Sequence, residues 1–246
     1  MARPLSDYTT LTFDCYGTLI DWESGIWDAY QPLIAANGRG DITRAKALVT
    51  HAGLEGAKQV ETPGMLYPEL LAQVHGGFAR RYGLESTAEM DAAFGASIAH
   101  WPAFPDTADA LRRLKQRYRL VILSNVNRAG FAASNAKLGV AFDAIYTAED
   151  IGSYKPTRRN FEHMLARLEA DHGVVAGQIL HTAQSLYHDH VPAGDFGLAR
   201  AWIDRQGLSK GGAWGATAQV PERPRLDFLF PTMAAMADAV EAETKG

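Results

Sequence analysis

Polar residues stand just after several short apolar runs of this sequence, where the carboxyl ends of strands are expected. Asp14 follows "LTF" and precedes Cys15 and Tyr16 in "FDCYGTL". The others are Ser124 and Asn125 after "LVIL", Lys155 in "GSYKPT", and His188 and Asp189 in "TAQSLYHDH". In open α/β sheets, ligands bind in the crevice outside the carboxyl ends of the strands. An ionisable side chain such as Asp14 therefore stands where this class of fold carries its chemistry.

Each of these residues also has an ordinary structural interpretation. Asp14 could form a turn before Gly17, and Ser124 or Asp189 could cap the helix that follows it. Lys155 could be a surface lysine, as most lysines are. Taken singly the signals are weak, but their shared position after strands indicates one common site.

The elements that must position these residues fall into two groups. From about Ser24 to Ala99 the sequence shows helical spacing, as in "WESGIWDAYQPLIAAN", which ends on the C-cap signal Asn37-Gly38. Beyond Pro105 short apolar strands such as "LVILSN", "QILHTAQ" and "ARAWIDR" alternate with helices, which predicts βαβ units and a parallel sheet covered on both faces. We therefore predict an α/β core formed by residues 1–19 plus 100–246 and an all-helical cap at 20–99. The segment "GLSKGGAWGATAQVPERPR" is predicted to be a surface loop in which Trp214 packs.

Composition narrows the functional classes. The chain has 246 residues, 47% of them hydrophobic, and a net charge of −4 with no long block of like charge. A basic footprint for nucleic acid and a long apolar span for a membrane are both missing from the sequence. Cys15 is the single cysteine, so no disulfide can form within the chain. These features predict a soluble, cytoplasmic protein that binds neither nucleic acid nor membranes.

The order of the motifs resembles the haloacid dehalogenase superfamily. That superfamily has a D-x-[D/x]-G-T motif after the first strand, then a Ser or Thr, a Lys and an acidic group after later core strands, matching Asp14, Ser124, Lys155 and Asp189. The resemblance covers nearly the whole chain. It implies a doubly wound, mostly parallel Rossmann-like sheet with an inserted helical cap, and an aspartate that forms a covalent ester with the substrate.

Tyr16 indicates which branch of the superfamily the sequence resembles. The phosphatases carry a second aspartate at this position, as general acid and base, and bind Mg²⁺, whereas "DCYGTLID" has the D-x-Y-G-T-L form of the type II (L-)2-haloacid dehalogenases. A halide leaves as a stable anion, so it needs neither a general acid nor a metal. The resemblance thus implies hydrolysis of short 2-haloalkanoic acids to 2-hydroxy acids, without metal or cofactor.

By this resemblance, roles can be assigned to the motif residues. Asp14 would displace the halide, Lys155 would hold the Asp14 carboxylate and lower its pKa, and Asp189 would activate or position the hydrolytic water. The expected substrate-binding groups are Tyr16, Ser124 and Asn125, with the cap arginine Arg44 on the halide and Arg39 as a competitor for that role. The resemblance also implies a homodimer.

Two positions depart from the pattern of the branch. Phe161 stands where the lysine motif is followed by a tyrosine, so one polar partner is missing. The fourth motif lacks its usual Ser and Asn, and we expect Gln184, Ser185 or His188 to position the water instead. Trp22, Trp27, Tyr67, Trp101 and Phe104 are expected at the junction of core and cap, as packing residues or as walls of a substrate pocket.

Three alternative functions remain open from the sequence. The same nucleophile could open the ring of a small strained amine that carries a 2-carboxylate. A Mg²⁺-dependent phosphatase is disfavoured by Tyr16. A non-catalytic binding protein on this fold would not need Asp14, Ser124, Lys155 and Asp189 together.

Overall fold

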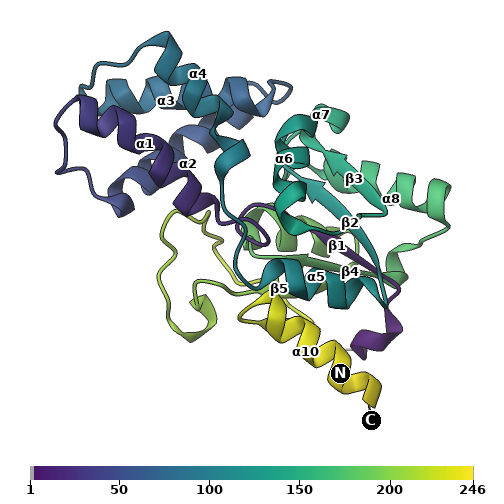
Figure 1. Ribbon diagram of the computed structural model, residues 1–246. Coiled ribbons are helices and arrows are strands. Elements are labelled where there is room, and N and C mark those ends of the chain that lie inside the picture. The colour runs from purple at the N-terminus through teal and green to yellow at the C-terminus, as the bar shows by residue number, and fades with distance from the viewer. Residues whose placement is uncertain (1–2, 246) are drawn as a thin grey trace.

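A computed structural model describes residues 3–245 and contains one open sheet of parallel strands (Figure 1). The strand order is β3-β2-β1-β4-β5-β6, so β1 lies in the middle, between β2 and β4. The strands are β1 (Thr10–Phe13), β2 (Arg119–Ser124), β3 (Ala144–Thr147), β4 (Ile179–Ala183), β5 (Ala199–Ile203) and β6 (Phe228–Phe230). This order confirms the predicted doubly wound, Rossmann-like α/β sheet.

Alternate residues of the strands pack on opposite faces of the sheet. Leu120 and Ile122 of β2 belong to the hydrophobic cluster that includes side chains of α5, α6 and α10, whereas Val121 and Leu123 belong to the cluster with α8 and α9. The helices of the core are α5 (Thr107–Lys115), α6 (Arg128–Leu138), α7 (Ala148–Ile151), α8 (Arg158–His172), α9 (Val191–Asp195) and α10 (Met233–Lys245). Both faces are therefore covered, which explains why β1, β2 and β4 are buried almost throughout.

The segment between β1 and α5 contains the helices α1 (Trp22–Ala36), α2 (Arg44–Glu61), α3 (Tyr67–Tyr82) and α4 (Ala88–Ala96). They form a group of their own beside the carboxyl ends of the strands (Figure 1). Tyr30 of α1 is fully buried among them, with its ring centroid 4.0 Å from that of Phe78 and 4.5 Å from that of Phe94. We refer to α1–α4 as the cap helices. The division of the chain into two domains at residues 20 and 100 stays a prediction.

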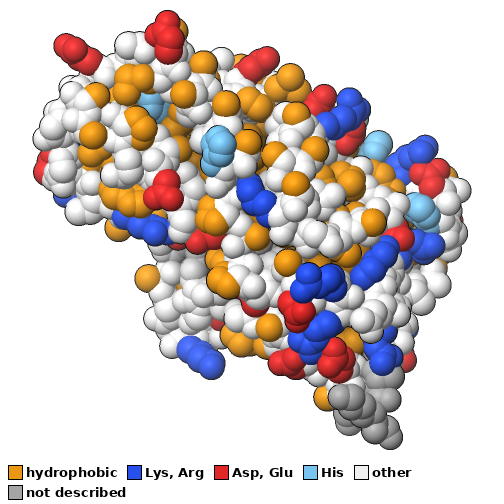
Figure 2. Space-filling model, in the orientation of Figure 1, with side chains coloured by type: hydrophobic (Ala, Val, Ile, Leu, Met, Phe, Trp, Pro, Cys, Tyr) orange, Lys and Arg blue, Asp and Glu red, His pale blue; other side chains and the backbone are white. Residues whose placement is uncertain are grey.

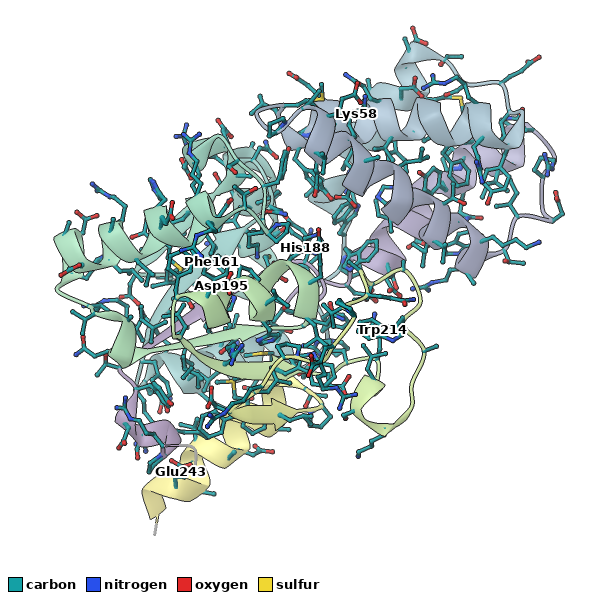
Figure 3. The ribbon with its side chains drawn as sticks, turned by 180° about the vertical axis from the view of Figure 1, so that it is seen from behind. Lys58, Phe161, His188, Asp195, Trp214 and Glu243 are labelled. Carbon is teal, nitrogen blue, oxygen red and sulfur yellow. The ribbon has the colours of Figure 1, made fainter. Side chains whose placement is uncertain are left out.

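Residues 206–226 form the long loop expected from the sequence, and it includes the short 3₁₀ turn η5 (Leu208–Lys210). Trp214 packs on a small hydrophobic cluster that contains Trp202 and Leu186, as predicted. The remaining short 3₁₀ turns are η1 (Leu5–Asp7), η2 (Ser97–His100) and η3 (Ala176–Gln178), and η4 (Leu186–His190) is a π-helical turn. Figure 3, seen from behind, shows this loop reaching from the core toward the cap helices.

Charged side chains of both signs are mixed on the face shown in Figure 2. Arg113, for example, contacts Asp238 and Glu241, and Lys115 contacts Asp143.

Among residues 3–245, no helix combines the length and the apolar character that crossing a bilayer requires.

Candidate active site

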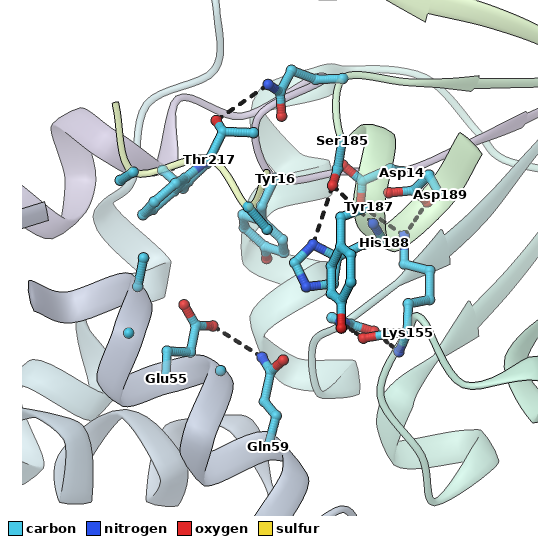
Figure 4. Close-up of a pocket in the computed structure, with 18 of the residues that line it drawn as sticks. Asp14, Tyr16, Glu55, Gln59, Lys155, Ser185, Tyr187, His188, Asp189 and Thr217 are labelled. Atoms are coloured by element: carbon cyan, nitrogen blue, oxygen red, sulfur yellow. Dashed lines mark hydrogen bonds and ion pairs between the residues drawn. The ribbon is translucent and has the colours of Figure 1, made fainter. Parts of the chain in front are cut away.

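A cavity of about 350 Å³ lies between the carboxyl ends of the strands and the cap helices (Figure 4). Eight of the residues expected at the site line it: Asp14, Tyr16, Asn125, Lys155, Gln184, Ser185, His188 and Asp189. Trp22 and Tyr67 also line it, so two of the five junction aromatics form its walls. The cavity therefore brings together residues that lie far apart along the chain.

The loop after β1 sets the position of Asp14. Gly17 has a φ of +94°, which side-chain-bearing residues rarely adopt, and a Cβ there would stand 3.2 Å from Gln184 Oε1 and from Trp22 Nε1. The chain then turns back, so that Thr18 Oγ1 donates a hydrogen bond to Asp14 Oδ2 at 2.9 Å. Gln184 N donates in turn to Thr18 Oγ1 at 2.9 Å, which fastens the loop to the end of β4.

Lys155 connects the two predicted catalytic carboxylates. Its Nζ lies 2.9 Å from Asp14 Oδ1 and 2.6 Å from Asp189 Oδ1, and it also donates to the carbonyl oxygen of Leu123 at 2.9 Å. All three charged side chains are nearly excluded from solvent. Lys155 does not directly follow β3, as the sequence suggested, because the four-residue helix α7 intervenes.

A buried chain of hydrogen bonds extends the site into the core, and the sequence analysis missed it. Asp189 Oδ1 lies 3.1 Å from His181 Nε2, and the other ring nitrogen of His181 lies 2.8 Å from Thr12 Oγ1. Phe161, in place of the expected tyrosine, packs edge-on against the His181 ring. The signal in the sequence was a histidine within "QILHTAQ", a strand that is otherwise apolar enough to be buried.

The pKa of Asp14 lies above its usual value. Burial raises this pKa, as does the negative charge of Asp189, while Lys155 and the hydrogen bond from Thr18 lower it by less. Lys155 thus lowers the Asp14 pKa, as predicted, but burial and Asp189 outweigh this contribution. The pKa of Asp189 is well below its usual range because Lys155 and His181 together outweigh its burial.

The side chains of Asn125, Ser124 and Tyr16, which were expected to bind the substrate, make other contacts or lie outside the cavity. Asn125 holds the lysine loop, with Nδ2 donating to the carbonyl oxygen of Lys155 and Oδ1 accepting from the Lys155 backbone N–H. Ser124 does not line the cavity, but its hydroxyl is buried and has no hydrogen-bond partner among the described residues. Tyr16 contacts Ser134 through its hydroxyl at 2.9 Å, and its ring packs edge-on against Trp101.

Neither candidate arginine reaches the cavity. Arg44 contacts Ser24 Oγ at 3.1 Å on the outside of the cap helices, and Arg39 pairs with Asp41. Both stand at the N-terminal side of α2, whereas the cavity is lined by the later residues 52–59 of that helix. The structure therefore places neither Arg44 nor Arg39 at the cavity, and the cap helices contribute Glu55 and Gln59 to its lining.

The fourth motif forms the wall opposite α2. Ser185 caps η4 by accepting a hydrogen bond from His188 N, and its hydroxyl lies 3.1 Å from His188 Nδ1. Burial lowers the pKa of His188, which keeps the imidazole neutral near pH 7.

Gln184 Nε2 contacts Gln206 and Thr217, so the long loop at 206–226 is tied to the site. The sequence did not indicate that Ala216–Ala218 would line the cavity, because the loop carries no recognisable motif.

The donor set does not fit the Mg²⁺ ion that phosphatases of this superfamily bind. An ammonium group stands between the two carboxylates, and Tyr16 occupies the position of the second aspartate. Within residues 3–245, no group of three or more His, Cys, Asp or Glu side chains is arranged to hold a metal.

Comparison with known proteins gives consistent results. A family model described as haloacid dehalogenase-like hydrolase matches residues 8–177. The chain is 30% identical over 202 residues to (S)-2-haloacid dehalogenase 4A of Burkholderia cepacia, covering 79% of this chain and 82% of that protein. The fold is similar to that of a defluorinating L-2-haloacid dehalogenase, with a TM-score of 0.77, 18% identity and coverage of 97% and 98%. It is also similar to L-2-haloacid dehalogenase from Xanthobacter autotrophicus with covalently bound chloropropionic acid (TM-score 0.74, 19% identity, coverage 95% and 98%).

The doubly wound sheet and the cavity at the carboxyl ends of its central strands place the chain among α/β enzymes. With these matches, it is a hydrolase and belongs to the haloacid dehalogenase-like hydrolase family. The family resemblance seen in the sequence is therefore confirmed.

Proposed function

We propose that this protein hydrolyses the carbon–halogen bond of short 2-haloalkanoic acids, with Asp14 as the nucleophile. The single observation that carries the proposal is the buried Asp14 carboxylate, held by Lys155 at 2.9 Å and open to the cavity, with Tyr16 in place of a general acid. The (S)-2-haloacid dehalogenases among its relatives support the same reaction.

In the first step an Asp14 oxygen attacks C2 of the substrate. The new C–O bond forms as the C–halogen bond breaks, and the halogen leaves with the bonding electrons as halide. The substrate carboxylate binds to the backbone N–H groups of Tyr16 and Asn125, which have no partner among the hydrogen bonds of the described residues. Thr18 and Lys155 hold the attacking carboxylate in place. The entropy cost of orienting the nucleophile is therefore met before the reaction begins.

In the second step water attacks the carbonyl carbon of the Asp14 ester. Asp189 accepts the water proton as the new bond forms, through Oδ2, which has no hydrogen-bond partner among residues 3–245. The ammonium group of Lys155 stabilises the negative charge that develops on the Asp14 oxygen of the tetrahedral intermediate. Collapse of this intermediate releases the 2-hydroxy acid, whose hydroxyl oxygen takes the proton from Asp189. The second proton of the water leaves the Asp14 carboxyl group for solvent, which restores the carboxylate. His188, Ser185 and Gln184 line the cavity and are proposed to position the water.

Halide release tests the proposed reaction. We expect the protein to release chloride or bromide from at least one enantiomer of 2-chloropropionate or 2-bromopropionate with EDTA present, as followed by ion chromatography. Phosphate release from small phosphate esters that depends on added Mg²⁺, with no halide release, would favour the phosphatase instead. Ligand binding without turnover of any of these compounds would favour a binding protein.

The pH dependence of kcat/KM follows from the Asp14 pKa. Because only the ionised carboxylate attacks, activity falls as the pH drops through this pKa, and we expect the acid limb to lie above about 3.9, the value for an unperturbed Asp. Thr18→Val removes a hydrogen bond that stabilises the carboxylate, so it should move the limb to higher pH. Thr18→Ser keeps the hydroxyl and is the matched control. An acid limb at the same pH in the Val and Ser variants would show that Thr18 does not act on Asp14.

A homodimer and a cytoplasmic location, both expected from the sequence, are part of this proposal. Sedimentation equilibrium of the purified protein tests the first, and a mass of about 27 kDa would contradict it.

A further inference from the structure

The cap side of the cavity carries a carboxylate where an anionic substrate alone would call for a cation. Glu55 of α2 lies across the cavity from His188, and its carboxylate is directed toward the space between His188 and Tyr16 (Figure 4). Its residual exposure is 17%. The position of this group is not explained by the displacement of halide on Asp14.

Neighbouring side chains hold Glu55 in its ionised form. Tyr67 donates its hydroxyl to Oε1 at 2.8 Å, Gln59 Nε2 donates to Glu55 Oε1 at 3.1 Å, and His51 Nε2 lies 3.4 Å from Oε2. The other ring nitrogen of His51 lies 3.0 Å from the hydroxyl of buried Tyr30, which fixes the ring. Although burial raises the pKa of Glu55, its contacts with His51 and Tyr67 bring that pKa below the usual range. The Glu55 carboxylate is therefore held in a fixed position by other side chains of the cap helices, unlike an acidic residue on the open surface.

The lining carries more negative than positive charge. Its acidic members are Asp14, Glu55 and Asp189, and Lys155, which contacts both Asp14 and Asp189, is its single Lys or Arg. Glu55 thus has no Lys or Arg partner within the described part of the cavity wall. A cationic group of a ligand beside Glu55 would supply the attractive charge that no Lys or Arg of this wall provides.

The walls near Glu55 suit an organic cation. Trp22 and Tyr67 line the cavity on the cap side, and Tyr187 lines it on the core side. Aromatic faces attract ammonium groups, and the attraction is stronger where water is excluded. On α2 the neighbouring lining residues are Ala52, Gly53 and Gly56. Alanine carries only a methyl group and glycine has no side chain, so these residues leave space beside the carboxylate. The cavity of about 350 Å³ lies within the range of pockets that hold drug-sized ligands, so it has room beyond a three-carbon acid.

We propose that the substrate is a 2-halo carboxylate whose side chain ends in a protonated amine, and that Glu55 binds this ammonium group between Trp22 and Tyr67. The inference rests on the proposed function for the reaction at C2, while the ammonium site itself concerns only binding. Glu55 is then a specificity-determining residue: it contacts the far end of the substrate, and Asp14 contacts the reacting carbon.

Binding of unreactive analogues tests the ammonium site without any turnover. We would measure dissociation constants by isothermal titration calorimetry for 3-aminopropionate, 4-aminobutyrate and 6-aminohexanoate, each against the acid of equal length without the amine. At least one amino acid of the series should bind 10-fold more tightly than its counterpart. Glu55→Gln should reduce this preference to less than twofold, and Glu61→Gln, an exposed acid of the same helix, should retain it.

The inference is overturned if no amino acid of the series binds more tightly than its unsubstituted counterpart to the unaltered protein, a comparison that does not depend on any variant folding. Halide release from 2-bromohexanoate and 6-amino-2-bromohexanoate then separates the two proposals. Equal kcat/KM for the two compounds contradicts the ammonium site and leaves dehalogenation intact. A binding preference for the amines with no halide release from any 2-halo acid contradicts dehalogenation and leaves the ammonium site intact.

Discussion

Replacing Asp14 with Asn should abolish halide release, with kcat falling by more than about 10³-fold. The amide has no negative charge with which to attack C2, yet it has the size of the carboxylate, so the cavity should keep its shape. Thr18 and Lys155 donate to different oxygens of Asp14, so the amide oxygen would keep one of these two hydrogen bonds. The measurement is halide production under saturating substrate, followed by ion chromatography over several hours.

A matched substitution separates this effect from general damage. Asp109→Asn makes the same change at an exposed acid of α5 and should leave kcat unchanged. Circular dichroism should show both variants folded at the assay temperature. Asp14→Asn with more than a tenth of the original kcat would contradict the role of Asp14 as nucleophile.

Replacing Lys155 with Met should cost both activity and stability. The ammonium group is buried and stands between Asp14 and Asp189, so its loss leaves two carboxylates close together without a cation. Breaking a buried ion pair by removing one partner typically costs about 3–5 kcal/mol. We therefore expect the free energy of unfolding at pH 7 to fall by about this amount, and halide release to be lost with it.

The difference in the free energy of unfolding between Lys155→Met and the unaltered protein should become smaller as the pH falls. Without Lys155 the pKa values of Asp14 and Asp189 in the folded state rise above those in the unfolded state, so the destabilisation is present above these pKa values and shrinks as both groups are protonated. In the unaltered protein the pKa of Asp189 is depressed, and the stability that it contributes is lost as pH falls through that low pKa. Urea unfolding at pH 7 and pH 4.5 should thus show a smaller gap between the two proteins at the lower pH.

Lys210→Met, at an exposed lysine of η5, is the control for the loss of a positive charge. It should change the free energy of unfolding by less than about 0.5 kcal/mol, as surface substitutions usually do. A free energy of unfolding for Lys155→Met equal to that of this control at pH 7 would contradict the prediction. It would mean that Asp14 and Asp189 are not both ionised next to Lys155 in the folded protein.

The sequence predicted the parts of the site that follow the strands of the sheet. Asp14, Asn125 and Gln184 come directly after β1, β2 and β4, and an apolar run that stops at a polar residue is a local pattern. The carboxyl ends of parallel strands meet at one edge, so residues far apart in the sequence could be placed together. The helical segment between β1 and α5 was equally visible, because its apolar spacing and caps are local.

The parts that were missed depend on tertiary packing. His181 lies inside a strand and contacts Asp189. Ala216–Ala218 line the cavity in a loop held by the packing of Trp214 and by the contacts of Gln184 with Gln206 and Thr217. Arg44 was chosen by its distance along the chain, which does not say which turn of α2 faces the core. Glu55 stands three turns further along the same helix, on the turn that the cavity meets.

The central claim is that Asp14 forms a covalent ester that water opens at the carboxyl carbon. A single turnover in H₂¹⁸O, with enzyme in excess over 2-chloropropionate, tests it most directly by mass spectrometry of the product and of the peptide that contains Asp14. If the ester forms, the hydroxyl oxygen of the product is ¹⁶O, taken from Asp14, and one ¹⁸O enters the Asp14 carboxylate. A product with ¹⁸O in its hydroxyl group and an unlabelled Asp14 would show that water attacks C2 directly, and the account would be wrong.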